Sequence, residues 1–162
     1  MISKFKGQYD FLSNFFMRAI IWEGVEYPSS EHAYQSAKTL DRVIRHRIAN
    51  LPTAAKAKAA GKRLVVRDDW EVVKVDVMRD IVATKFRQHP DLAEQLLATG
   101  TAELREGNTW GDIFWGVNKY GTGSNWLGRI LMDLRLELST ERAQPLREQF
   151  EASMALIRSL CK

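Results

Sequence analysis

The chain has 162 residues, of which 45% are hydrophobic and 27% charged, so it is long enough for one globular domain with its own core. Its apolar runs are short and its N-terminus lacks the apolar stretch of a signal peptide, which argues against a membrane span and indicates a cytoplasmic protein. A single cysteine, Cys161, excludes an internal disulfide, and the three histidines lack metal-ligand spacing, so we expect neither a metal site nor a cofactor.

The net charge of +4 is unevenly distributed along the chain. Residues 42–67 contain eight lysines and arginines and no acidic residue, whereas the rest of the chain holds 16 basic and 20 acidic residues. A basic field of this kind attracts phosphate-bearing partners. Two solvated, lysine-rich helix faces would give the same count, so both interpretations stay open at this point.

A β-hairpin followed by a helix is the first predicted unit. Apolar residues alternate on both sides of Glu23-Gly24 within residues 19–28, which predicts a hairpin with its turn at that pair. Pro28 and the two serines after it are expected to end the second strand and cap a helix over residues 30–39.

The rest of the chain is predicted to be mainly helical, which makes the whole of residues 1–162 a single α+β domain with a small β-sheet or hairpin. Asp68-Asp69 is expected to cap the longest helix, whose apolar residues recur at helical spacing. The tail is expected to be helical with a break near Pro145. The predicted helices cover residues 41–50, 53–64, 70–89, 90–100 and 126–138, the strands residues 101–107 and 112–117, and a glycine-rich loop residues 118–125.

The helix over residues 30–39 is more polar than a packing helix requires. Glu31, Gln35 and Lys38 are spaced i, i+4 and i+7, so they share one face and are able to line one wall of a cleft. Glu31 also lies in the first turn, where the helix dipole favours a carboxylate. A capped surface helix with a Glu–Lys pair would show the same spacing, so the pattern alone does not assign a function.

Aromatic residues and glycines gather in the segment NTWGDIFWGVNKYGTGSNWLG. Trp110 and Trp115 each precede a glycine, the second being Gly116, and Asp112 lies between the two Trp-Gly pairs. Aromatic rings beside glycine-lined backbone are suited to stacking on a planar base. The alternative is an aromatic core next to a flexible loop.

Two further stretches carry polar groups suited to a nucleotide. Gly123 and Asn125 immediately precede a predicted helix start, where backbone N–H groups are able to approach a phosphate. Asn14 lies among phenylalanines that include Phe15, and a buried amide commonly binds a base or ribose edge. Trp70, directly after the Asp68-Asp69 pair, fits ordinary helix core equally well.

The chain resembles the NADAR (YbiA-like) family over about residues 5–138. The segments that carry the resemblance are FLSNFF (11–16), SEHAYQSAK (30–38), KFRQHPDLAEQLLATG (85–100) and GSNWLGRILMDLR (123–135), in the family's order. The resemblance implies a compact α+β fold rich in helices. It does not cover residues 139–162, which we expect to form a C-terminal helix.

The resemblance also implies an activity, the hydrolysis of an N-glycosidic bond between ribose and an amino group on a guanine-like ring. It implies two substrate classes: ADP-ribose on guanine in nucleic acid, often beside an ADP-ribosylating toxin, and ribosylamino-pyrimidine phosphates of riboflavin biosynthesis. The basic stretch of residues 42–67, which has no acidic residue, favours ADP-ribose on guanine in nucleic acid. By the resemblance the active-site positions are Glu31, Trp70, Asp112 and Trp115, and the substrate-contacting positions are Asn14 and Phe15.

Two mechanisms are consistent with these residues. Glu31 and Asp112 would divide acid and base roles, as paired carboxylates do in glycoside hydrolysis. Alternatively, the Lys38 amine would exchange into a ring-opened ribose imine as a Schiff base. A non-catalytic ADP-ribose- or NAD-binding module is the alternative of another class, and the two carboxylates argue against it. The expected partner is ADP-ribosylated nucleic acid or a phosphorylated ribosylamino small molecule, without a membrane partner, and the oligomeric state stays open.

Overall fold

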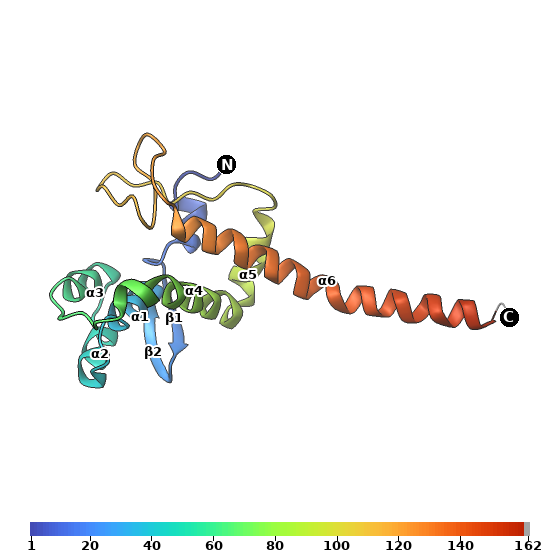
Figure 1. The fold of residues 1–162 in the computed structure, drawn as a ribbon, viewed down its shortest axis with the longest axis horizontal. Helices are drawn as coiled ribbons and strands as arrows, with labels where there is room; N and C mark the ends of the chain where they lie inside the picture. Colours follow the sequence, from blue (N-terminus) through green and yellow to red (C-terminus); the bar gives the residue numbers. More distant parts are fainter. Residues whose placement is uncertain (161–162) are drawn as a thin grey trace.

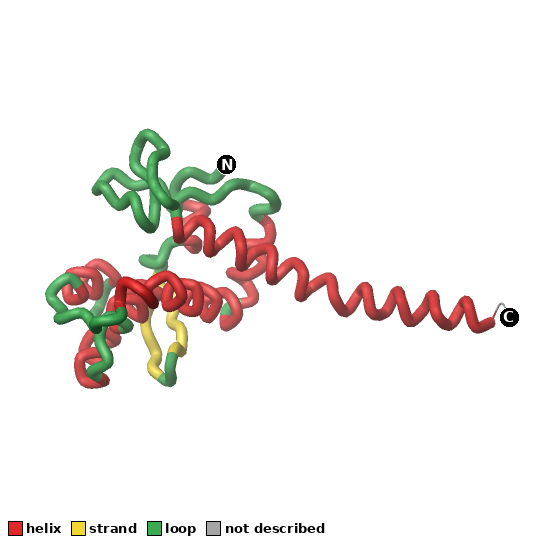
Figure 2. Tube along the Cα trace, viewed as in Figure 1, coloured by secondary structure: helices red, strands yellow, loops and turns green. Residues whose placement is uncertain are grey.

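The computed structural model describes residues 1–160, without the side chains of residue 146 and residues 155–160; Cys161 lies outside the described residues. The chain is mostly helical with one small sheet, which confirms the predicted α+β class (Figures 1 and 2). The elements are the 3-10 helix η1 Gly7–Leu12, strands β1 Met17–Trp22 and β2 Val25–Ser29, and helices α1 Ser30–Ser36, α2 Arg42–Ala49, α3 Ala54–Gly61, α4 Trp70–Gln88, α5 Pro90–Ala98 and α6 Trp126–Leu160.

Strands β1 and β2 form the predicted antiparallel hairpin. Glu23 and Gly24 connect them, with φ of 47° and 76°. A two-residue turn of this kind needs positive φ at both positions, which glycine adopts without strain. The hairpin turns Ile20, Trp22 and Tyr27 into the core.

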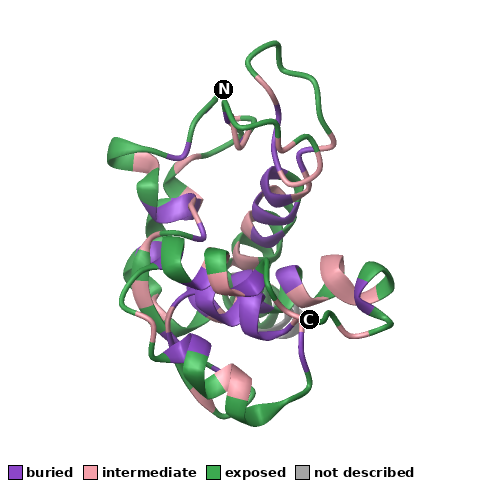
Figure 3. Cartoon of the chain, turned by 90° about the vertical axis from the view of Figure 1, so that its left-hand side faces the viewer, coloured by how far each residue is buried: buried purple, intermediate pink, exposed green. Residues whose placement is uncertain are grey.

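Helix α1 lies at the centre of the molecule, and all seven of its residues are buried. Figure 3 shows buried residues gathered in the middle of the body, with exposed segments around them. The Ser29 side chain caps α1 by accepting the backbone N–H of His32. The His32 ring pairs with Ser29 Oγ at 2.7 Å and with the Leu51 carbonyl at 3.0 Å, so this histidine is a satisfied structural one.

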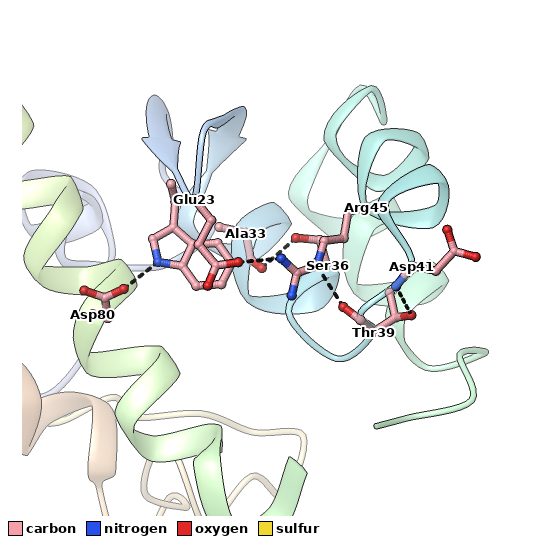
Figure 4. A network of polar contacts seen from close by, with 8 residues as sticks. Glu23, Ala33, Ser36, Thr39, Asp41, Arg45 and Asp80 are labelled. Atoms are coloured by element: carbon pink, nitrogen blue, oxygen red, sulfur yellow. Dashed lines mark hydrogen bonds and ion pairs between the residues drawn. The ribbon is translucent and has the colours of Figure 1, made fainter. Parts of the chain in front are cut away.

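Arg45 of α2 connects the hairpin turn to the end of α1 (Figure 4). Its Nε donates to the Thr39 carbonyl at 2.8 Å and its Nη1 pairs with Glu23 at 2.5 Å. The guanidinium also lies over the Trp22 ring, whose Nε1 donates to Asp80 of α4 at 2.7 Å. These contacts hold β1, α1, α2 and α4 together on one side of the body.

The hydrophobic core is one cluster that extends from the hairpin and α1 to the place where α4 and α5 meet the first turns of α6. Helix α6 then projects away from the body, with the C-terminal end of the described chain far from the rest (Figure 1). None of the helices within residues 1–160 is long and apolar enough to cross a membrane. The fully buried residues of this core include Ile81, Phe86, Leu92, Leu96, Leu127, Ile130 and Leu131.

Four local predictions differ from the structure. The segments 101–107 and 112–117 are not strands; they make only single bridges, Ile2 with Leu104 and Gly107 with Val117. The Asn108 side chain binds the backbone of Asp112, and the Asp112 side chain accepts the backbone N–H of Trp115, so side chains take up backbone groups that a ladder would need.

The other three concern where helices begin and end. Helix α6 continues through Pro145 without ending. Because Pro145 has no N–H, the Glu141 carbonyl lacks its hydrogen bond within the helix. Both residues are exposed, so this carbonyl is open to water. At the start of α4 the Asp69 side chain makes no cap bond, because both its oxygens bind Arg67, at 2.5 and 2.6 Å. Helix α1 is also shorter than expected and ends at Ser36.

Candidate active site

A cavity of about 840 Å³ opens between four parts of the chain. The N-terminal segment with η1 forms one wall, α1 and α3 form a second, and the loop after α5 forms a third, with Met78 of α4 also in the lining. Pockets that bind small molecules or cofactors have volumes of roughly 300–1,000 Å³. The cavity is therefore large enough for a nucleotide-sized group.

The polar face of α1 lines this cavity as its spacing predicted. Glu31, Gln35 and Lys38 all contribute to the lining. Gln35 Nε2 donates to Glu31 Oε1 at 2.7 Å, whereas the buried Gln35 Oε1 has no hydrogen-bond partner among the described residues. Gly61 of α3 makes room for this amide, because a Cβ at Gly61 would lie 1.8 Å from Gln35 Oε1. The Gln35 amide therefore holds the Glu31 carboxyl with its N–H, while its oxygen is packed against α3.

The two titratable groups of this face shift in opposite directions. Burial raises the pKa of Glu31, although the Gln35 amide, Lys58 and Lys38 oppose the shift. Burial lowers the pKa of Lys38, although Glu31 opposes that shift. Near neutral pH the face therefore favours the protonated carboxyl and the neutral amine more than the free amino acids do. Those are the forms that a general acid and an amine nucleophile need.

Asn14 and Phe15 lie in the opposite wall of the cavity. The Asn14 carbonyl accepts the Glu31 N–H at 3.0 Å, and its Nδ2 contacts Met78 Sδ at 3.1 Å. Lys85 of α4 holds this segment from behind, because its buried Nζ donates to the carbonyls of Phe11 and Ser13. The segment that presents Asn14 is thus fixed on both sides.

The aromatic loop contributes Trp110, Asp112 and Trp115 to the lining, as predicted. Asp112 Oδ1 accepts the backbone N–H groups of Phe114, at 3.1 Å, and Trp115, at 2.9 Å. Trp115 packs edge-on against Tyr34 of α1, with ring centroids 5.4 Å apart. Asp112 therefore both shapes the loop and faces the cavity.

Four predicted substrate-binding residues do not line the cavity. Among the described residues, Trp70 packs behind the wall against Tyr34, with ring centroids 5.2 Å apart. Gly116 and Gly123 support the loop backbone, since a Cβ at Gly123 would lie 2.3 Å from the Gly116 carbonyl oxygen. The Asn125 side chain binds the backbone of residues 104 and 106. These residues support the site from outside the cavity.

The cavity also contains residues that the sequence did not single out as site residues, above all Tyr34, Lys58 and Glu106, together with Lys6 and Asp10. Lys58 Nζ lies 5.4 Å from the Phe15 ring and 5.6 Å from the Trp110 ring. In the sequence Lys58 is one of several lysines of a basic stretch, and only the packing of α3 shows that this one enters the cavity.

Comparisons with known proteins agree with this architecture. The NADAR domain family matches residues 3–139. N-glycosidase YbiA of Escherichia coli (strain K12) is 39% identical over 136 residues, which cover 83% of this chain and 84% of YbiA. N-glycosidase Npun_R5314 of Nostoc punctiforme is 36% identical over 135 residues, which cover 80% of this chain and 86% of that protein.

A riboflavin biosynthesis protein of Vibrio vulnificus is 44% identical over 130 residues; these cover 79% of this chain, but only 35% of the Vibrio protein. The NMR structure of E. coli YbiA superposes with a TM-score of 0.76 at 37% identity, covering 88% of this chain and 89% of YbiA. The names of the two N-glycosidases confirm the expected reaction class. The chain belongs to the NADAR domain family and is a hydrolase that acts on N-glycosyl bonds.

Proposed function

We propose that this protein removes ADP-ribose from the amino group of guanine bases in nucleic acid. The observation that supports this substrate is the position of the acid-free segment 42–67, which forms α2 and α3. Lys58 of α3 enters the cavity, while Arg42, Arg47, Lys56, Lys62 and Arg63 are exposed. A cavity with an exposed basic surface beside it suits a substrate whose phosphates continue beyond the reacting sugar.

The chemistry that the cavity offers fits cleavage of a glycosylamine. Positive charge that develops at the sugar C1′ needs a carboxylate nearby, and the leaving nitrogen needs a proton. Glu31 and Asp112 both face the cavity. Lys58 and Lys38 are close enough to act on the carboxyl of Glu31, and they supply positive charge for substrate phosphates.

A Schiff base with Lys38 is the second chemical route. The lowered pKa of Lys38 increases the fraction of its nucleophilic neutral form. Borohydride added during turnover would trap the imine, and peptide mass spectrometry would locate the adduct among the three cavity lysines, Lys6, Lys38 and Lys58. A lack of adduct together with full activity of Lys38→Ala would exclude this route for Lys38.

Ribosylamino-pyrimidine phosphates are the alternative substrates. The riboflavin biosynthesis protein of Vibrio vulnificus favours them, because it is similar to this chain over 130 residues. The cavity lysines suit a single sugar phosphate as well as a diphosphate. In that case the exposed residues of α2 and α3 would not affect turnover.

The test is a parallel assay of the purified protein on four substrates. These are ADP-ribosyl-guanosine, a DNA oligonucleotide ADP-ribosylated on guanine, and the two ribosylamino-pyrimidine phosphates. We expect fastest release of the unmodified base from the oligonucleotide. Faster cleavage of a pyrimidine phosphate would contradict the nucleic-acid proposal, and binding of ADP-ribose without cleavage of any substrate would indicate a binding module.

A further inference from the structure

Glu106 is one of four carboxyl groups that line the cavity among the described residues, with Asp10, Glu31 and Asp112. It lies in the loop after α5, about 75 positions away from Glu31, in a segment that the sequence predicted to be a strand. Its side chain has no hydrogen-bond partner among the described residues, so its carboxyl is free to bind a ligand. It is partly buried, as a group in the wall of an open cavity is.

The backbone of Glu106 is fixed on both sides of the residue. Its N–H donates to Asn125 Oδ1 at 3.0 Å, and its carbonyl accepts the Val117 N–H at 2.9 Å. Gly116 allows this close approach, because a Cβ there would lie 2.2 Å from the Glu106 carbonyl oxygen. The side chain is therefore presented to the cavity by a well-defined backbone.

Asn125 has a conformation that needs an explanation. It is buried and has a φ of 52°, in the left-handed region that is uncommon for residues other than glycine. Its Nδ2 donates to the Leu104 carbonyl at 2.8 Å, so one amide bridges the backbone on either side of Arg105. Gly128 makes room for it, since a Cβ there would lie 2.4 Å from Asn125 Nδ2. Both hydrogen bonds of the Asn125 side chain therefore fix the segment that carries Glu106.

The charges around Glu106 differ from those around Glu31. The pKa of Glu106 is raised to about 7, mainly by burial and then by the nearby charges of Asp112 and Glu31, and Lys58 alone opposes the shift. The carboxylate of Glu31 is stabilised by the Gln35 amide and by two lysines, Lys58 and Lys38. Of these two carboxyls, Glu106 has fewer neighbours that favour its charged form. Environments that give two carboxyl groups different pKa values commonly assign the acid role to one of them and a different role to the other.

We propose that Glu106 is a catalytic residue of this protein, the general acid that protonates the leaving nitrogen, and that Asn125 is a positioning residue that aims it. The proposal rests on the N-glycosidase function proposed above. As the bond between C1′ and nitrogen breaks, its electron pair stays on nitrogen, which takes the proton of the Glu106 carboxyl. Water then bonds to C1′ and returns a proton to Glu106, so the products are the free amine and ribose with a hydroxyl at C1′. Glu31 and Asp112 are left to stabilise the charge at C1′ and to orient the water.

The first test compares Glu106→Gln with Glu103→Gln on the substrate that the wild type cleaves best. Glu103 is exposed and pairs with Arg105 in the same segment, so it is a matched control. General acid catalysis contributes about 10²–10⁴-fold, so we expect kcat of Glu106→Gln to fall by that factor, with KM little changed. We expect the wild-type kcat to fall at alkaline pH, where Glu106 loses its proton; this fall is the alkaline limb of the pH profile. The limb should disappear in Glu106→Gln and remain in Glu103→Gln. A loss of less than about threefold, or a loss that keeps the alkaline limb, would overturn the proposal.

The second test concerns Asn125→Gly, which keeps the left-handed conformation and removes both side-chain bonds. We expect kcat to fall with KM nearly unchanged, and the alkaline limb to move. If instead KM rises and kcat holds, Asn125 contacts substrate and does not position Glu106. Thermal unfolding of each variant identifies any change that only reflects lost stability.

A readout without turnover separates this inference from the proposed function. The ¹³C chemical shift of the Glu106 carboxyl, assigned by comparison with Glu106→Gln, should titrate near pH 7 in the free protein. Asp112→Asn should lower that midpoint, because it removes a nearby negative charge. Titration at the ordinary value of glutamate would exclude Glu106 as the acid, whichever substrate the protein cleaves. A wild type that cleaves none of the four substrates would contradict the proposed function instead.

Discussion

The catalytic role proposed for Glu31 comes with a cost in stability, and one substitution separates the two. Because burial raises the pKa of Glu31 above its unfolded value, folding is favoured while the carboxyl is protonated, and that advantage is lost as pH rises through the folded pKa. Glu31→Gln keeps an acceptor oxygen for the Gln35 amide but carries no charge. We expect turnover to fall by roughly 10²–10⁴-fold.

The same variant should melt at a higher temperature than the wild type at pH 8, and the difference should shrink towards pH 4. Calorimetry at both pH values measures it. Near-normal turnover in Glu31→Gln would contradict the catalytic assignment, and an equal melting difference at both pH values would contradict the burial argument.

Lys85 stabilises the segment that carries Asn14. It is fully buried, and burial lowers its pKa to about 7, so between that pH and its unfolded pKa the unfolded chain binds more protons and stability rises with pH. A neutral amine has two N–H groups for its two carbonyl acceptors. We expect Lys85→Met to cost about 1–3 kcal/mol by leaving these carbonyls unpaired, and to abolish the rise in stability above pH 7.

Urea unfolding at pH 6 and pH 9 checks this, with exposed Lys56→Met as the control. A wild type whose stability does not rise over that range would show that Lys85 stays charged in the fold.

At the level of single residues, the sequence predicted the site residues that lie close to one another along the chain. The spacing of Glu31, Gln35 and Lys38 along one helix is enough to place them on one wall. Glu106 is different, because it meets Glu31 only through the packing of a loop against α1, and nothing local links the two. Asn125 was predicted to bind substrate since it precedes a helix, but its amide is used by the backbone of residues 104 and 106.

The same holds for the secondary-structure elements: those set by local requirements were predictable from the sequence. The turn at Glu23-Gly24 was predictable because positive φ at two successive residues is a local requirement. The segments 101–107 and 112–117 were predicted to be strands, but the side chains of Asn108 and Asp112 bind backbone groups of residues 112 and 115. A strand needs a partner that the sequence does not specify, and here the two segments form isolated bridges only, Ile2 with Leu104 and Gly107 with Val117.

Helix α6 divides into a part that packs and a part that projects. Leu131 and Leu134 are buried, whereas beyond residue 139 the contacts with the body are exposed ion pairs, Arg87 with Glu141 and Arg142 with Glu94. Exposed pairs contribute about 0–1 kcal/mol each. A chain that ends at Ser139 should therefore keep its activity and lose only a few degrees of Tm.

Leu134→Ala in the full chain is the contrasting variant, since truncating a buried leucine costs about 2–5 kcal/mol. Loss of activity in the shortened chain, measured beside this variant, would show that the projecting part of α6 takes part in the function.

At the scale of the whole molecule, the site is assembled from segments far apart in sequence. The N-terminal segment forms one wall, α1 and α3 form a second and the loop after α5 forms a third, and α4 holds the N-terminal segment through Met78 and Lys85. One result of this assembly is that Lys58 brings α3 into the cavity wall, while the exposed basic residues of α2 and α3 lie on the surface outside it. If phosphates of the substrate lie on that surface, binding must depend on ionic strength.

The double variant Arg47→Glu and Lys56→Glu tests that surface, since both residues are exposed and neither lines the cavity. We expect KM for the ADP-ribosylated oligonucleotide to rise at least about tenfold at low salt, and the slope of log KM against log salt to fall by about 2, one for each lost phosphate contact. KM for ADP-ribosyl-guanosine should not change, because it carries no flanking phosphates. Lys119→Glu with Arg147→Glu makes the same change in net charge at exposed positions away from α2 and α3, and it should leave both substrates unaffected. An equal loss in the two double variants would mean that only the net charge matters, and the surface of α2 and α3 would then have no specific role.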